Sequence, residues 1–157
     1  MDVVKHFTAT GIVRNHHGGV LLIRHKKLGV WLPPGGHVEE NETPDDAVLR
    51  EILEETGVRA RIVSPKRLSL RPVGCTELYP PFLSLLEDIA GDGSHLHIDL
   101  IYLCEAESEA LRAQEAETTG IGWFDPESVP DLDTYENVRQ SIRLAVQKDF
   151  FLLNDRQ

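Results

Sequence analysis

Three glutamates are the residues of this chain whose types and spacing most clearly suit chemistry. Glu51, Glu54 and Glu55 stand at i, i+3 and i+4 within residues 43–56, where the pattern predicts a helix. Side chains at that spacing share one side of a helix, and like charges there destabilise it. A hard divalent cation such as Mg²⁺ would offset this repulsion, because Mg²⁺ prefers oxygen ligands. The alternative is an acidic face that water alone covers.

The predicted helix has clear ends. Thr43 suits the N-cap, Pro44 suits the first helical position, and Gly57 suits the C-terminal end. Apolar side chains lie on the arc opposite the glutamates, and we expect this arc to face the core: Val48, Leu49, Ile52 and Leu53. The helix is thus predicted to have one apolar side and one acidic side.

The glutamates also belong to a longer pattern. Between Gly36 and Val58 the sequence GHVEENETPDDAVLREILEETGV fits G-x5-E-x7-R-E-U-x-E-E-x-G-U at every fixed position, where U is a bulky aliphatic residue. A motif with this many fixed positions is specific, and it resembles the Nudix box. Residues 20–24 and Trp31 are also similar to residues that precede the box in members of that family.

The resemblance implies both a fold and a metal site. The implied fold is a single Nudix hydrolase domain over residues 1–157, an α/β/α sandwich with a mixed central β-sheet. Glu51, Glu54 and Glu55 would bind Mg²⁺, for which Mn²⁺ can substitute. A backbone carbonyl of Gly35 or Gly36 would complete the ligands that the protein provides. In some members the residue corresponding to Glu51 also orients or deprotonates the attacking water.

Other residues receive supporting roles from the same resemblance. Arg50 would orient the neighbouring carboxylates, and Glu42 would brace the loop without touching the metal. Nudix enzymes often use a further acid as an extra ligand or general base, and four acids outside the box are available: Glu87, Asp99, Glu115 and Glu117. We choose Glu117, because its place in the acidic loop before Trp123 is similar to that of the extra glutamate in nucleotide-sanitising members. The alternative is an exposed loop acid.

Candidates for substrate contact lie on both sides of the box. We expect His37, which follows the double glycine, to touch phosphate, and Arg24 to supply positive charge. Tyr79 or Phe82 could stack on a base. Each of these residues could equally belong to the surface or the core. Pro33 stands where many members have leucine, which leaves the substrate class open.

Two histidines raise a separate question. His95 and His97 alternate along a predicted strand, so their imidazoles should point to the same side. Such a pair could contact a transition metal or phosphate. A histidine pair at the end of a hairpin is the favoured interpretation, because the sequence marks no third ligand.

The activity that the resemblance implies is Mg²⁺-dependent hydrolysis of a pyrophosphate bond in a nucleoside diphosphate linked to another moiety. We expect a nucleoside triphosphate as substrate and a nucleoside monophosphate as product. ADP-ribose or another nucleotide sugar is the next alternative, and a noncatalytic module that senses a nucleotide is the rival from another class. Crowded carboxylates should hold protons tightly, so the apparent metal affinity should rise from about pH 6 to about pH 8.

Composition limits the cellular location and the binding partners that we expect for this chain. The 157 residues include 26 acids and 16 bases, a formal charge of −10 that opposes binding to nucleic acid, including removal of pyrophosphate from messenger RNA 5′ ends. Cys75 and Cys104 form no CxxC pair and are predicted to be ordinary buried thiols. The chain shows no apolar run long enough to span a membrane and no secretory signal pattern, so we expect a cytoplasmic protein. A homodimer is compatible with the sequence.

The elements that must position these residues are predicted from short apolar runs and from helical spacing. Strands are expected at residues 8–14, 20–24, 30–32, 59–64, 67–72, 81–86, 97–105 and 122–124. The first two should form a hairpin across residues 15–19, and a loop should begin at the prolines and glycines of residues 33–36. A second helix is expected to face the core with Tyr135, Val138, Ile142 and Ala145. Residues 150–153 are either core or a contact surface.

Overall fold

The computed structural model describes residues 3–63 and 73–147. Its elements follow the chain in this order: β1 (Val4–Arg14), β2 (Val20–His25), β3 (Trp31–Leu32), β4 (Gly35–His37), α1 (Pro44–Thr56), β5 (Ala60–Ile62), β6 (Leu83–Asp88), β7 (His95–Ala106), β8 (Thr118–Phe124), the 3₁₀ helix η1 (Pro126–Asp131) and α2 (Glu136–Gln147). Within these residues, no helix combines the length and the apolar character needed to cross a bilayer.

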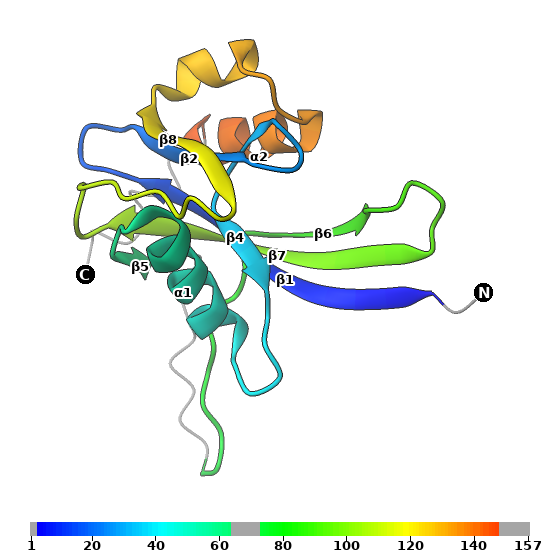
Figure 1. The fold of residues 1–157 in the computed structure, drawn as a ribbon. Coiled ribbons are helices and arrows are strands. Elements are labelled where there is room, and N and C mark those ends of the chain that lie inside the picture. The colour runs from blue at the N-terminus through cyan, green and yellow to red at the C-terminus, as the bar shows by residue number, and fades with distance from the viewer. Residues whose placement is uncertain (1–2, 64–72, 148–157) are drawn as a thin grey trace.

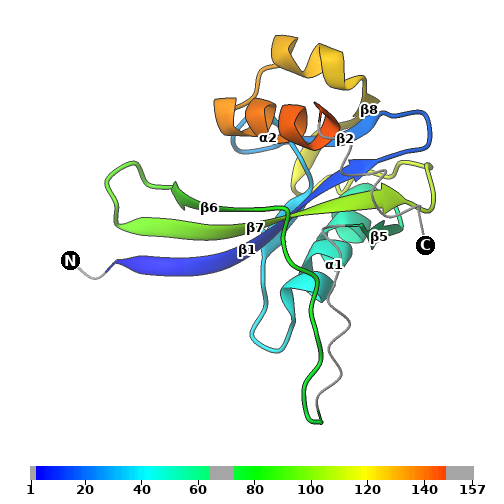
Figure 2. The ribbon, with the colours of Figure 1, turned by 180° about the vertical axis from the view of Figure 1, so that it is seen from behind.

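The strands form one mixed sheet that is built around a long parallel pair. β1 and β7 run side by side from Val4 opposite His95 to Arg14 opposite Glu105, and β2, β4, β5 and β6 add to them in antiparallel pairing. α1 covers one face of the sheet, while η1 and α2 cover the other (Figures 1 and 2). The predicted α/β/α sandwich with a mixed central sheet is therefore confirmed.

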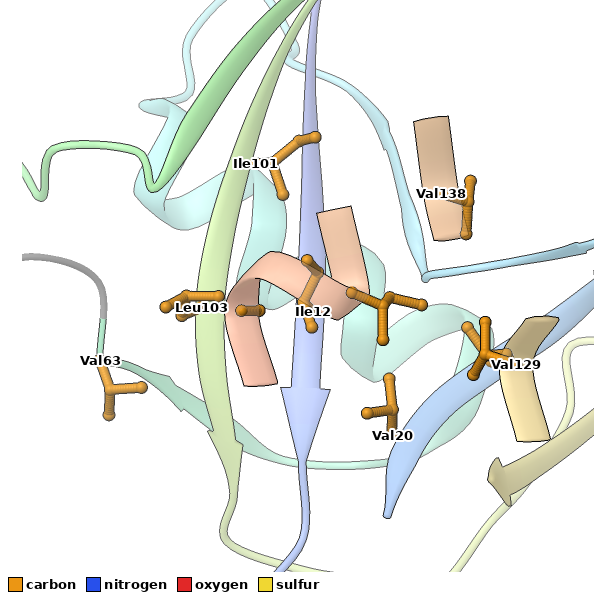
Figure 3. Packing of buried hydrophobic residues seen from close by; sticks show 10 residues of the cluster. Ile12, Val20, Val63, Ile101, Leu103, Val129 and Val138 are labelled. Atoms are coloured by element: carbon orange, nitrogen blue, oxygen red, sulfur yellow. The ribbon is translucent and has the colours of Figure 1, made fainter. Parts of the chain in front are cut away.

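Two apolar clusters fill the space between the sheet and its helices. Ile12 and Leu103 of the central strands pack under α2 with Ile142, and Figure 3 shows the labelled strand residues gathered around Ile12. Val13 belongs to the second cluster, which packs under α1 with Ile52. Successive residues of a strand point to opposite faces, so neighbours in β1 contribute to different layers.

The predicted hairpin and first helix are confirmed. β1 and β2 pair in antiparallel fashion around a turn in which the Asn15 side chain accepts the backbone N–H of Gly19 at 2.8 Å. α1 occupies the predicted residues. β8 begins earlier than predicted, at Thr118, because it pairs with the whole of β2. The predicted strand at 67–72 and the apolar residues 150–153 lie outside the described residues.

Four local expectations were wrong. Residues 35–37 form β4 rather than a loop, because the glycine pair accommodates the close approach of β1. Leu53 is 46% exposed, so the apolar arc of α1 is narrower than predicted. Tyr135 lies before α2 and is exposed, so the core-facing stripe begins at Val138. Cys75 is exposed, whereas Cys104 is buried as expected.

Candidate active site

The ends of α1 are held by local hydrogen bonds that follow from the sequence. The Thr43 side chain caps the first turn by accepting the backbone N–H of Asp46 at 3.2 Å, and Pro44 occupies the first turn, where no N–H is needed. Gly57 ends the helix in the left-handed conformation, with φ 73°, and its N–H donates to the Leu53 carbonyl. These caps hold the turns that carry the three glutamates in a defined position.

β4 brings the glycine pair against those glutamates. Gly36 pairs with Ala9 of β1, and a Cβ atom on Gly36 would overlap the Glu51 carboxylate. The Gly35 N–H donates to Glu55 Oε2 at 3.0 Å, and a Cβ atom on Gly35 would lie 2.7 Å from the Ala9 carbonyl oxygen. Gly35 therefore requires glycine, whereas a side chain at Gly36 would displace the Glu51 carboxylate, and the backbone of β4 forms one wall of the acidic site.

The three carboxylates differ in their environments. Glu55 is only 3% exposed, and burial raises its pKa to about 8, while the nearby charges of Glu51, Glu117 and Glu54 add to the shift. Burial also raises the pKa of Glu51, against the opposing effect of Arg50. Glu54 is exposed. From the sequence we attributed the proton retention of these carboxylates to their crowding. Burial is the larger cause, and helical spacing alone does not reveal burial.

Arg50 connects the helix to the preceding loop. Its Nε and Nη2 donate to the two oxygens of Glu42 at 2.7 and 3.0 Å, and Nη1 donates to Glu51 at 2.9 Å and to Glu54 at 3.1 Å. Nη2 also donates to the His37 carbonyl at 3.1 Å. The Arg50 guanidinium lowers the pKa of Glu42. Such a forked ion pair fixes both carboxylate and loop geometry, which a lysine could not reproduce.

This donor set fits a hard divalent cation. Glu55 is buried and Glu51 is partly buried, burial raises the pKa of both carboxyls, and Glu54 lies on the same side of the helix. Carboxylate and backbone carbonyl oxygens are ligands that Mg²⁺ accepts. Glu51, Glu54 and Glu55, with a carbonyl of Gly35 or Gly36, are the groups that would hold it.

Glu117 and Arg24 flank the end of β2. Glu117 is exposed and directly precedes β8, and its carbonyl accepts the backbone N–H of Lys26 at 2.8 Å. Its negative charge raises the pKa of both Glu51 and Glu55, so its carboxylate lies within electrostatic range of them. The exposed Arg24 donates through Nε to the Gly29 carbonyl at 3.1 Å, which directs it toward the β2–β3 turn.

The three remaining predicted contacts lie in different places. The His37 ring faces the rings of His6 and His97, with centroids 5.2 and 5.0 Å away, while its carbonyl binds Arg50. Tyr79 packs against the apolar cluster under α1, whereas Phe82 packs against the cluster under α2. Tyr79 and Phe82 thus lie on opposite faces of the sheet and do not form one base-stacking platform.

A polar pocket on the α2 face was not predicted as a unit. Asp99 accepts the Thr8 and Thr10 hydroxyls, each at 2.9 Å, and Glu87 accepts the Asn137 amide at 2.8 Å. Burial raises the pKa of both carboxyls. All of these groups except Thr8 line, together with Pro33, a cavity of about 40 Å³ between the sheet and α2. The alternation of polar residues along β7 could have indicated a polar face on that strand. It could not have identified Glu87 of β6 and Asn137 of α2, because only the fold brings them to Asp99.

A mixed sheet between helical layers, with a capped helix that carries three carboxylates and holds two of them against a glycine pair, defines this chain as an α/β/α sandwich with an acidic loop–helix site. The particular family follows from comparison with known proteins. A model of the NUDIX domain matches residues 4–145, and the chain belongs to the Nudix hydrolase family.

Individual relatives agree with this assignment. The m7GpppN-mRNA hydrolase NUDT17 of Danio rerio is 38% identical over 106 residues, which cover 64% of this chain and 33% of that protein. An 8-oxo-dGTP diphosphatase of Proteus vulgaris is 39% identical over 62 residues, covering 37% of this chain and 55% of that protein. The chain thus spans about a third and about half of the lengths of these two relatives.

A solved structure extends the likeness to the whole fold. A hydrolase of the Nudix family from Clostridium perfringens superposes with a TM-score of 0.77 at 28% identity, covering 90% of this chain and 99% of that one. The fold of this chain therefore matches that of a solved Nudix hydrolase over nearly its whole length.

Proposed function

We propose that this chain is a Mg²⁺-dependent pyrophosphohydrolase acting on a nucleoside diphosphate linked to another moiety, with a nucleoside triphosphate as the favoured substrate. The observation that carries the proposal is the placement of Glu51 and Glu55 against the glycine pair of β4, with Glu55 buried and Glu54 on the same side of the helix. A buried carboxylate of this kind is expected where a cation completes the site.

The residues divide the chemical work between them. A bound Mg²⁺ would neutralise pyrophosphate oxygens and make a coordinated water easier to deprotonate. Arg50 holds Glu51 and Glu54 in position from the side. Hydrolysis forms a bond from the water oxygen to phosphorus and breaks the bond to the bridging oxygen, which releases a nucleoside monophosphate. Glu51 or Glu117 would accept the proton of the water, and Glu117 as this base remains a prediction.

The polar pocket under α2 lies across β4 from the acidic site and would contact part of a bound substrate. Gly35 pairs with Thr10, whose side chain lines the pocket, while the Gly35 N–H reaches Glu55 on the other side of β4. Asn137 and the carboxyls of Asp99 and Glu87 offer hydrogen-bonding groups there, and the cavity of about 40 Å³ has room for a small polar group of the substrate rather than a whole base. A substrate lying across β4 would reach both sites.

The named relatives also support a nucleoside triphosphate, since one is an 8-oxo-dGTP diphosphatase. The likeness to m7GpppN-mRNA hydrolases favours a second candidate, cleavage within the cap of a 5′ RNA end. The formal charge of −10 opposes binding to a long RNA but not to an isolated cap dinucleotide. ADP-ribose and nucleotide sugars remain alternatives with the same scissile group.

A substrate panel with Mg²⁺ tests the proposal. Nucleoside triphosphates, 8-oxo-dGTP, ADP-ribose, a UDP-sugar and the cap dinucleotide are incubated with the parent chain, and products are separated by chromatography. Glu54→Gln and Glu55→Gln should each lower kcat at least about 100-fold on the preferred substrate, because each loses a ligand carboxylate. The exposed Glu107 provides the matched control Glu107→Gln, which should retain activity.

Two outcomes would contradict the proposal. Nucleotide binding by the parent without turnover, measured by calorimetry in Mg²⁺, would identify a noncatalytic sensor. Full activity in both glutamine variants would remove the acidic site from the reaction.

A further inference from the structure

Four histidines from three strands gather on the α2-facing side of the sheet, near the start of β1. His6 of β1 lies opposite His97 of β7 in the parallel register, and His95 lies two residues earlier on the same face. His37 of β4 follows Gly36 and joins from the other side of β1. Figure 1 shows this part of β1 and β7 extending beyond the body of the molecule, away from α1.

The geometry brings ligand atoms, and not only rings, together. One nitrogen from each of His6, His95 and His97 lies within 4.8 Å of the others. His95 Nε2 and His6 Nδ1 are 3.2 Å apart, a distance that also permits a hydrogen bond. Two nitrogens bound tetrahedrally to one zinc ion are about 3.4 Å apart, as follows from bonds of about 2.0–2.1 Å. Small side-chain rotations would therefore bring all three onto one ion.

A second observation that points to a bound ligand concerns the ring of His97. Its Nε2 atom is buried and has no hydrogen-bond partner among the residues that the structure describes. A buried ring nitrogen without a partner is unfavourable unless something binds it. Burial, followed by the charges of the neighbouring histidines, lowers the pKa of His97, which favours the neutral form of the ring.

We propose that His6, His95 and His97 form a binding site for a divalent transition-metal ion, with Zn²⁺ as its first occupant, separate from the carboxylate site. Imidazole nitrogens suit zinc, copper and nickel, whereas Mg²⁺ prefers oxygen ligands. Among the described residues the three-member group contains no carboxylate, which makes magnesium a poor competitor.

The site is open to solvent and has room for a fourth ligand. His6 is exposed, so water or an anion can reach the three rings, and the ring of His37 lies close enough to serve instead. Bound zinc would tie together positions 6 and 97, which are distant in sequence, and would stiffen the extended strands beside the acidic site.

Calorimetric titration of Zn²⁺ into a chain without an affinity tag tests the proposal. The protein is first stripped of metal and then held in millimolar Mg²⁺, which occupies the carboxylates. We expect one zinc ion per chain and a Co²⁺ absorption spectrum typical of nitrogen ligands in tetrahedral geometry. His97→Gln should weaken binding at least about tenfold, and so should His6→Gln, whose exposed side chain can be replaced without disturbing the core.

Two controls separate this site from other sources of zinc binding. His17→Gln removes an exposed histidine of the β1–β2 turn and should leave zinc affinity unchanged. Glu54→Gln removes a carboxylate of the acidic site and should also leave it unchanged. Unaltered zinc affinity in both His97→Gln and His6→Gln would overturn the proposal, as would loss of the zinc site in Glu54→Gln. Neither readout requires hydrolytic activity.

Discussion

The acidic site and the histidine cluster, defined as His6, His37, His95 and His97, are neighbours that are assembled in opposite ways. The carboxylates of the acidic site come from two turns of one helix and meet the backbone of β4. The histidines come from β1, β4 and β7, and the parallel register of β1 with β7 brings them together. One site offers oxygen to a hard ion, and the other offers nitrogen to a softer one.

The two sites also differ in what holds their ligand side chains in position. In the acidic site Arg50 spans loop and helix: two of its hydrogen bonds anchor it to Glu42, and two hold Glu51 and Glu54 before any metal arrives. In the histidine cluster the rings mainly contact one another, with centroids about 5 Å apart. The acidic site is therefore organised by the protein alone, whereas the proposed cluster site would be organised partly by its metal.

The largest effect expected from this comparison is a dependence of magnesium binding on pH. The pKa of Glu55 is raised to about 8, and that of Glu51 is also raised, so protons compete with the metal below that range. Protons leave as the pH rises, and apparent affinity should increase about 10- to 100-fold from about pH 6 to about pH 8, then level off. Calorimetry with the metal-free protein measures this change.

A rise in magnesium affinity above pH 6 distinguishes the buried carboxylate from an exposed one. A carboxylate with an ordinary pKa would already be charged at pH 6, and magnesium affinity would not change above it. Glu55→Gln should bind magnesium more weakly and with a flatter pH profile. A flat profile in the parent chain would show that burial does not hold protons on the site.

Arg50→Lys should have the next largest effect. Lysine keeps the charge but cannot donate to Glu42, Glu51 and Glu54 together through a planar fork, so the ligands lose their fixed positions. We expect kcat/KM on the preferred substrate to fall at least about tenfold, as is usual when the groups that orient metal ligands are replaced.

Arg61 offers the matched control for this substitution. It pairs with Glu105 on the surface, between β5 and β7, and its side chain is about half exposed. Arg61→Lys should leave kcat/KM unchanged, because exposed ion pairs contribute little. Equal losses of kcat/KM in the two variants would mean that Arg50 acts through overall stability. Thermal unfolding of both variants would then show a lowered stability.

The same comparison explains what could be predicted from the sequence. The acidic helix was predictable because caps, helical spacing and the motif are all local, from Thr43 to Gly57. Of the histidine cluster only the pair of His95 and His97 was predicted, because His6 and His97 meet through strand register, and a parallel pairing of distant strands leaves no local signal. Burial of Glu55 was missed for a similar reason, since the backbone of β4 covers it.

His37 lies where the two regions meet, and its replacement should produce the smallest effect. Its backbone belongs to the acidic site through Arg50, while its ring faces His6 and His97. If the exposed ring contacts a substrate phosphate, as the sequence predicted, His37→Gln should raise KM about threefold with kcat nearly unchanged, since one such contact contributes about 0.5–1.5 kcal/mol. His17→Gln is the matched control. An unchanged KM would remove His37 from substrate binding, and a fall in zinc affinity in the same variant would assign its ring to the histidine cluster.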